Sequence, residues 1–214
     1  MRPAPRLADR RDRLLTAALP NVAFDGWSLA ALRAAAAETG ISIAEATAAF
    51  PAGGIDLVSW FSDWADRRML VELPPGIETM RVRDRIAVCA RTRLAVLAPH
   101  REAVRASLAI LALPQNAPRA ARLLYATVDA MWYASGDTAT DFNFYTKRAL
   151  LAGVYAATTL YWLDDRSLDF TETHGFLDRR LADVMAIPKA TARLRSATSY
   201  LPNPFRLIEI VRRR

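Results

Sequence analysis

The sequence predicts an all-α protein: a helical bundle with a small three-helix head, a longer helical body and an amphipathic helix at the C-terminal end. Three observations support this fold class. Hydrophobic residues make up 52% of the 214 residues and only 8 are glycine, a composition that favours helices over sheets. Apolar residues recur at helical spacing, and no segment alternates convincingly with a period of two. Cap and turn residues divide the chain into three short helices followed by longer ones.

Cap residues define the head. Ser28 is placed to cap its second helix, and Gly40 stands where helices commonly end. Ser42 and Glu45 have the spacing of a capping box, so a short third helix begins there. The head is assigned to residues 9–54. A first helix with an apolar stripe from Leu14 to Val22 is predicted up to the break at Asp25-Gly26, and two more helices are predicted over 28–40 and 42–50.

The body is predicted over residues 55–190. Pro74-Pro75-Gly76 separates its first long helix from the rest, and Asp169 and Glu172 have box-like spacing at the start of its last one. The predicted helices of the body cover about residues 55–73, 79–97, 101–113, 118–135, 142–163 and 169–187. The remaining segment, 191–214, is predicted to be a linker and a short helix over 203–213.

Basic charge lies at the two ends of the chain. The formal net charge is +7, but residues 1–13 carry a net +3, residues 193–214 a net +5, and residues 14–192 a net −1. Because the body is nearly neutral, the basic balance by itself does not indicate a nucleic-acid-binding domain.

Cysteine content and hydropathy indicate the cellular compartment in which the protein is expected. The only cysteine, Cys89, excludes an internal disulfide, and its apolar helical surroundings predict a buried thiol. The basic N-terminal segment is not followed by an apolar run typical of a secretory signal. No stretch of 18 uncharged apolar residues occurs. We therefore expect a cytoplasmic protein without a membrane-spanning helix.

Motifs for catalysis, metals and cofactors are missing from the sequence. The two histidines, His100 and His174, fall in different predicted helices, and neither belongs to a Glu-x-x-His pair of a di-iron bundle. There is no zinc motif, no Gly-x-Ser-x-Gly nucleophile motif and no glycine-rich phosphate loop. Asp164 and Asp165 are expected in solvent at a helix end. The sequence thus predicts no catalytic residue, no metal and no cofactor.

Residues 12–58 resemble the DNA-binding head of TetR-type regulators, with a Gly-aromatic turn, a Gly-Ile-Ser turn and a Phe-Pro pair in order. DNA binding needs cations for the phosphates and long polar side chains for the bases. Between residues 28 and 63 the only basic residue is Arg33, against four acidic ones. Ala48 and Gly54 stand where these regulators usually have a tyrosine and a lysine. We therefore expect a degenerate head without nucleic-acid partners; a ligand-responsive TetR-type regulator is the alternative.

The second half of the chain combines an aromatic cluster with an apolar helix. The aromatic residues flank a polar loop at 135–141, and the helix that follows is apolar almost all round from Ala149 to Leu163, which predicts that it is buried. Its many small residues leave space beside it. This pattern fits either a solidly packed core or a tunnel for an apolar ligand with an aromatic patch for a partner. The cluster comprises Trp132, Tyr133, Phe142, Phe144 and Tyr145.

The same stretch closely resembles the ubiquinone-biosynthesis lipid-binding family (the Coq nine family). The order of matching elements is kept from about residue 12 to 187, and the Gly-Asp to Tyr-Thr-basic-Arg run is highly specific. The matching segments are Leu113-Pro114-Gln115-Asn116-Ala117-Pro118, Val128-Asp129-Ala130-Met131-Trp132, Gly136-Asp137, Thr140-Asp141-Phe142-Asn143, Tyr145-Thr146-Lys147-Arg148 and Asp169-Phe170.

The resemblance implies a homodimer with a TetR-like fold that has lost DNA binding. It implies a hydrophobic pocket for an isoprenoid quinone intermediate or a phospholipid, and presentation of quinone precursors to the demethoxyubiquinone hydroxylase or other ubiquinone-pathway enzymes. The implied partner-binding residues are Met131, Asp141, Phe144 and Tyr145. Phe144 departs from the family member compared, which has tryptophan there. An adaptor that binds the hydroxylase without lipid is a further alternative.

Helix faces and positions in the body suggest which side chains line a lipid pocket. The candidates are Trp60, Trp64, Leu94, Leu108, Leu111, Leu124, Val128, Trp132, Leu151, Val154 and Tyr155.

The segment 203–214 predicts an amphipathic helix that is too short to span a bilayer. Its apolar and basic residues occupy opposite sides of a helical wheel, the pattern of a helix lying at a membrane surface, here the inner face. A helix folded back onto its own domain is the alternative. The predicted membrane-binding residues are Phe205, Arg206, Leu207, Ile208, Ile210, Val211 and Arg212.

Overall fold

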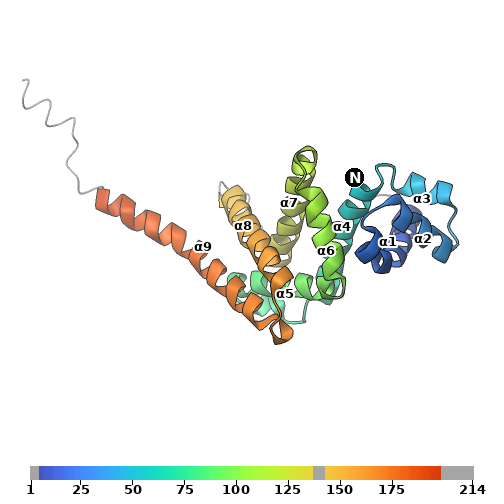
Figure 1. Cartoon of the computed structure of the whole chain (residues 1–214). Helices are drawn as coiled ribbons and strands as arrows, with labels where there is room; N and C mark the ends of the chain where they lie inside the picture. Colours follow the sequence, from blue (N-terminus) through green and yellow to red (C-terminus); the bar gives the residue numbers. More distant parts are fainter. Residues whose placement is uncertain (1–4, 137–142, 199–214) are drawn as a thin grey trace, which may run out of the picture.

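The computed structural model describes residues 5–136 and 143–198 of the chain. All regular structure within these residues is helical (Figure 1), which confirms the predicted all-α fold class. Short 3-10 turns precede α5, α6, α7 and α9. The helices are α1 (Pro5–Asp25), α2 (Leu29–Thr39), α3 (Ile43–Ala49), α4 (Gly54–Glu72), α5 (Val82–Leu97), α6 (Arg101–Leu111), α7 (Ala117–Ala134), α8 (Asn143–Asp164) and α9 (Thr171–Thr198).

Helices α1 to α3 form the head at one end of the molecule (Figure 1). The Ser28 hydroxyl accepts a hydrogen bond from the backbone of α2, and Gly40 ends that helix with a φ of 67°. Ser42 and Glu45 make both hydrogen bonds of a capping box at the start of α3. The caps predicted for the head are therefore confirmed.

Trp27 joins the head to the body. Its indole Nε1 donates to the carbonyl oxygen of Ala103 in α6 at 3.1 Å, and its ring centroid lies 5.2 Å from that of Phe61 in α4. Gly54, the first residue of α4, lies against the Trp27 backbone: a Cβ there would be 1.9 Å from the Trp27 carbonyl oxygen. Only glycine permits this close approach of two backbone segments.

Helices α4 to α8 build the body around a continuous apolar core. Helix α4 packs on α5 and α7, and α7 packs on α8. Fully buried side chains of this core include Leu57, Met69 and Trp162. Cys89 is also fully buried, as predicted, and burial raises the pKa of its thiol to about 11. Helix α9 begins against α8 and α5 and then extends away from the body (Figure 1).

The predicted boundaries of two helices are wrong. The helix predicted from residue 79 begins at Val82, because residues Ile77–Thr79 form a separate turn and Met80 is extended. The helix predicted over 169–187 begins at Thr171 and continues to Thr198, past Pro188. A proline inside a helix removes one hydrogen bond, but the helix can continue beyond it with a kink.

The start of α9 is capped by residues other than the predicted pair. Asp169 lies in the preceding turn with a φ of 51°, and it does not cap the helix. Asp165 does so instead: its carboxylate accepts from the backbone N–H of Ser167 at 2.7 Å and of Thr173 at 2.9 Å, and from the Thr173 hydroxyl at 2.5 Å. The expectation that Asp165 lies in solvent is wrong, because these donors draw it into the junction of α8 and α9, where it is 4% exposed.

Replacing Asp165 with alanine is expected to lower the free energy of unfolding by about 2–3 kcal/mol at neutral pH, since a buried charged acceptor of several hydrogen bonds is lost. Burial opposes its charge, but the hydrogen bonds from Ser167 and Thr173 outweigh burial and lower the pKa of Asp165. A lowered folded-state pKa gives stability that is present above the unfolded carboxyl pKa of about 4 and is lost as pH falls below it. Urea unfolding at pH 7 and pH 3 measures both effects.

The neighbouring Asp164 provides the control for this prediction, because its side chain is 84% exposed. Alanine at position 164 is expected to change stability by less than about 0.5 kcal/mol. Equal effects of the two substitutions, or a difference that does not shrink in acid, would contradict the capping role of Asp165.

Helix α8 is not buried on all sides, contrary to the expectation from its composition. Tyr155 and Trp162 face the core, but Leu160 is 60% exposed and Ala149 and Gly153 lie on the same open side. Those three positions are spaced four and seven residues apart, so they form one face of the helix. The described chain therefore leaves an apolar face of α8 uncovered.

No helix in the described part of the chain combines the length and apolar character needed to cross a membrane. The predicted amphipathic helix over 203–213, with the seven membrane-binding candidates, lies outside the described residues.

Candidate functional site

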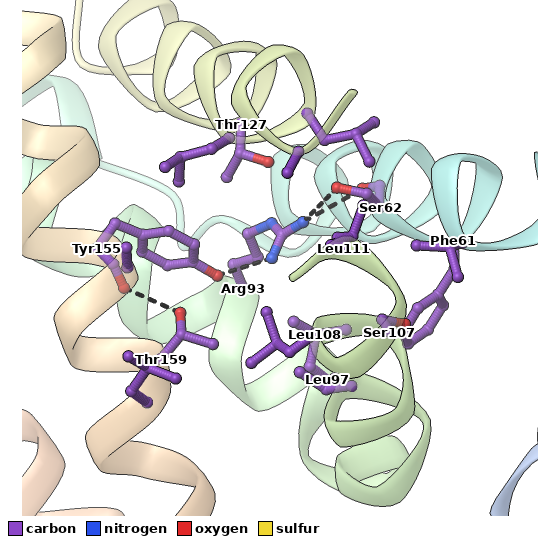
Figure 2. Close-up of a pocket in the computed structure, with 17 residues that line it drawn as sticks. Phe61, Ser62, Arg93, Leu97, Ser107, Leu108, Leu111, Thr127, Tyr155 and Thr159 are labelled. Carbon is purple, nitrogen blue, oxygen red and sulfur yellow. Dashed lines mark hydrogen bonds between the residues drawn. The ribbon is translucent and has the colours of Figure 1, made fainter. Parts of the chain in front are cut away.

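A cavity of about 250 Å³ lies between the helices of the body and is partly open to the surface. Five helices, α4 to α8, contribute to its wall (Figure 2). Leucine, valine and alanine predominate, with Phe61 at one side. The lining residues are Val58, Phe61, Ser62, Arg93, Leu97, Val104, Ser107, Leu108, Leu111, Ala120, Leu123, Leu124, Thr127, Tyr155, Ala156, Thr159 and Leu160.

One side of this cavity carries a buried polar cluster, which we define as Ser62, Asp66, Arg93, Thr127 and Tyr155. The guanidinium of Arg93 is central: Nε donates to Asp66 Oδ1 at 2.6 Å and Nη1 to the Tyr155 hydroxyl at 2.7 Å. Nη2 donates to the Ser62 hydroxyl at 3.1 Å, and the Thr127 hydroxyl donates to Asp66 Oδ1 at 3.0 Å. Figure 2 shows Tyr155 and Ser62 on either side of Arg93. The cluster links α4, α5, α7 and α8.

The cluster keeps an ion pair inside the body. Burial opposes the charge of Arg93, but attraction to Asp66 and Tyr155 and their hydrogen bonds outweigh it, so the pKa of Arg93 lies above its usual value. Asp66 is 9% and Arg93 6% exposed. The two charges compensate each other, so the cluster is polar but carries no net charge when both groups are ionised.

The size of the cavity limits what it can hold. A cavity of about 150 Å³ accommodates benzene. By the same measure, about 25 Å³ per heavy atom, the cavity here accommodates about ten heavy atoms, which corresponds to a small ring or to about two isoprene units. A longer lipid has to extend through the opening.

Four of the eleven predicted lipid-binding residues line this cavity: Leu108, Leu111, Leu124 and Tyr155. The other seven lie elsewhere. The Trp60 indole donates to Asp12 of α1 at 2.8 Å, and Trp64 packs on His100. Leu94 faces a different depression beside α9. The remaining four are buried in the core between α5, α7 and α8: Val128, Trp132, Leu151 and Val154.

Sequence reasoning missed the charged members of the polar cluster, Asp66 and Arg93. A signal was available, because Arg93 shares its helix face with the apolar residues Ile86, Ala90 and Leu97. A charge within an apolar helical stripe has to find a buried partner or leave the core. The sequence does not show which of the many acidic residues supplies that partner.

The predicted partner-binding residues are only partly within the described chain. Met131 is fully buried, so it lies in the core and not on the surface, because its side of α7 packs against α5. Tyr133, two positions further, is 80% exposed. Asp141 lies outside the described residues, as do the side chains of Phe144 and Tyr145 at the start of α8.

Several residues of the matching segments hold α7 and α8 together. Arg148 is 4% exposed, and its Nε donates to Asp129 at 2.7 Å. The ammonium group of Lys147 lies 5.7 Å from the centroid of the Trp132 ring. The specific run in the sequence therefore includes residues that fix the packing of these two helices.

The head lacks a cationic surface on the helix that would read DNA. Glu45 of α3 forms an ion pair with Arg10 at 3.0 Å, and the Thr47 hydroxyl donates to the backbone of its own helix. The close approach at Gly54 excludes a lysine side chain at that position.

Comparisons with known proteins place the chain in a family. The family model for COQ9 matches residues 117–188. The ubiquinone biosynthesis protein COQ9, mitochondrial, of Rattus norvegicus is 35% identical, with 91% of this chain and 69% of the rat protein covered. The Homo sapiens protein of the same name is 36% identical over 86% of this chain. The chain spans only 60% of that human protein.

A solved structure supports the fold. The crystal structure of the TetR transcriptional regulator from Nitrosomonas europaea matches with a TM-score of 0.67 at 23% identity, covering 83% of this chain and 98% of that one. This likeness confirms the TetR-like fold and says nothing about activity. Together with the sequence identity to the rat protein, these findings show that the chain belongs to the COQ9 family.

Proposed function

We propose that this chain acts in ubiquinone biosynthesis as an accessory protein that binds an isoprenoid quinone intermediate and presents it to the pathway hydroxylase at a membrane surface. The relatives are ubiquinone biosynthesis proteins, which supports the assignment to this pathway. The observation that supports lipid binding is the apolar cavity of about 250 Å³ that helices α4 to α8 enclose.

The energetics of such binding are favourable but moderate. Burying one isoprene unit, about four to five apolar carbons, contributes about 3–4 kcal/mol. Two units contribute about 6–8 kcal/mol before the costs of association, which corresponds to micromolar affinity at best. A reversible carrier needs affinity in this range, because its lipid has to leave again.

The experiment that tests this function is organic extraction of the purified protein followed by mass spectrometry. We expect an isoprenoid quinone intermediate in the extract, with a phospholipid as the other lipid that the cavity would accept. An extract without any lipid, from protein that also fails to bind added quinone, would reject the proposal.

We include a homodimer in the proposal. The exposed face of α8, with Ala149, Gly153 and Leu160, supports it, because an apolar helix face that is exposed to water is more stable when another surface covers it.

The membrane part of the proposal depends on residues 203–214, which carry four arginines beside apolar residues. Deleting this segment is expected to abolish flotation with vesicles that contain anionic lipid, because both apolar insertion and attraction to the headgroups are lost. Circular dichroism should show that the rest of the protein stays helical. Vesicles of neutral lipid are the control, and flotation unchanged by the deletion would exclude this attachment.

A further inference from the structure

The hydroxyl of Tyr155 has a defined direction within the polar cluster. Its oxygen accepts a hydrogen bond from Arg93 Nη1 at 2.7 Å. A hydroxyl oxygen that accepts from a cation has to aim its own proton elsewhere, and the contact with the cation makes that proton a better donor. Tyr155 is 4% exposed and lines the cavity. Among the described residues, no acceptor takes the proton of this hydroxyl.

The carboxylate of the cluster is engaged by its neighbours and is not part of the cavity wall. Asp66 Oδ1 accepts from Arg93 at 2.6 Å, and the single hydroxyl proton of Thr127 is shared between Oδ1 at 3.0 Å and Oδ2 at 3.1 Å. Asp66 also compensates the charge of Arg93. The cluster therefore offers the cavity a hydrogen-bond donor without a net positive charge, while the carboxylate of Asp66 stays outside the lining. Such a site favours a neutral acceptor, such as a carbonyl or ether oxygen, over an anion or a hydrogen-bond donor.

We propose that the Tyr155 hydroxyl donates a hydrogen bond to a carbonyl oxygen of a neutral quinone lipid, whose ring enters the cavity while its isoprenoid tail extends toward the opening. This inference rests on the proposed lipid-binding function and adds the orientation of the ligand. Figure 2 shows the Tyr155 hydroxyl beside Arg93 among the lining leucines. The cavity of about 250 Å³ has room for a quinone ring but not for its tail as well, so the tail has to extend toward the opening. The ring is then shielded from water in the carrier and has to leave the cavity before a partner enzyme can modify it.

The test compares two probes and two variants in the full chain. The probes are a ubiquinone with a single isoprene unit and prenylbenzene, which has a ring and the same isoprene unit but no oxygen. Tyr155→Phe removes only the hydroxyl, and the matched control Leu108→Ala removes apolar contact from the same cavity. Titration calorimetry measures the dissociation constants, and thermal unfolding confirms that both variants are folded.

We expect Tyr155→Phe to weaken quinone binding about 3-fold to 10-fold, the effect of one lost hydrogen bond, and to change prenylbenzene binding less than about 2-fold. Leu108→Ala should weaken the binding of both probes. Infrared spectra of quinone labelled at its carbonyl carbons should show one carbonyl band lowered in frequency in the wild-type complex and restored in Tyr155→Phe. This shift reports the hydrogen bond itself, which a purely structural role of Tyr155 would not produce.

The outcomes separate the inference from the function on which it rests. Wild-type protein that binds neither probe would reject the lipid-binding function. Wild-type protein that binds both, with Tyr155→Phe changing both equally or neither and with no shifted carbonyl band, would reject the orientation while lipid binding stands.

Discussion

Replacing Asp66 with alanine is expected to lower the free energy of unfolding by about 3–5 kcal/mol, the largest effect we expect from a single substitution in this chain. Arg93 is 6% exposed and would stay charged without its carboxylate partner. Thr127 would also lose its acceptor. Urea denaturation followed by circular dichroism measures the change.

Two further variants make this prediction specific. Asp183→Ala breaks the exposed ion pair with Arg180 and is expected to lower the free energy of unfolding by less than about 1 kcal/mol. The double variant Asp66→Leu with Arg93→Met should recover most of the stability, because well-packed apolar residues often replace a buried pair without loss. If Asp66→Ala lowers the free energy of unfolding no more than Asp183→Ala does, the polar cluster does not stabilise the packing of the body's helices.

Replacing Ala156 with phenylalanine is expected to reduce the lipid recovered with the purified protein at least about 10-fold. Ala156 lines the cavity from α8, and a ring at this position occupies volume that the lipid needs. Protein stability should change by about 1–3 kcal/mol at most, since the added ring enters an existing space. Mass spectrometry of organic extracts, normalised to protein, gives the lipid content.

The matched control is Ala126→Phe, which adds the same ring to an exposed position of α7. This variant is expected to keep its lipid. Equal lipid content in wild type and Ala156→Phe would mean that the lipid binds outside this cavity, and loss of lipid in both variants would point to a general disturbance of the helices around it.

Local sequence signals predicted the helices well because each signal acts over a few residues. The capping box of Ser42 and Glu45 and the end of α2 at Gly40 depend only on neighbouring backbone groups, and both are confirmed. The predicted start of α9 was wrong because it also relied on a local signal, the spacing of Asp169 and Glu172. Asp165 caps it from six residues before the helix, which is possible only because the chain turns back there with Asp169 at a φ of 51°.

The sequence predicted the residues of the candidate site less well than the helices. Helical faces identified Leu108, Leu111, Leu124 and Tyr155 correctly as residues of the body's interior, and all four line the cavity. The same criterion also selected Val128 and Leu151, which pack against other helices. Periodicity identifies which residues face inward, but a residue facing a cavity and one facing a neighbouring side chain have the same pattern.

The amino-acid sequence alone determined the helical fold class, the order of the helices and the family resemblance, because these depend on composition, spacing and residue identity. Only the tertiary structure decided that Asp66 and Arg93 meet, that Gly54 lies against Trp27, and that space remains between α4 and α8. These properties depend on the distances between helices that are far apart in the chain. Such distances follow from the packing of all side chains together, which no local pattern encodes.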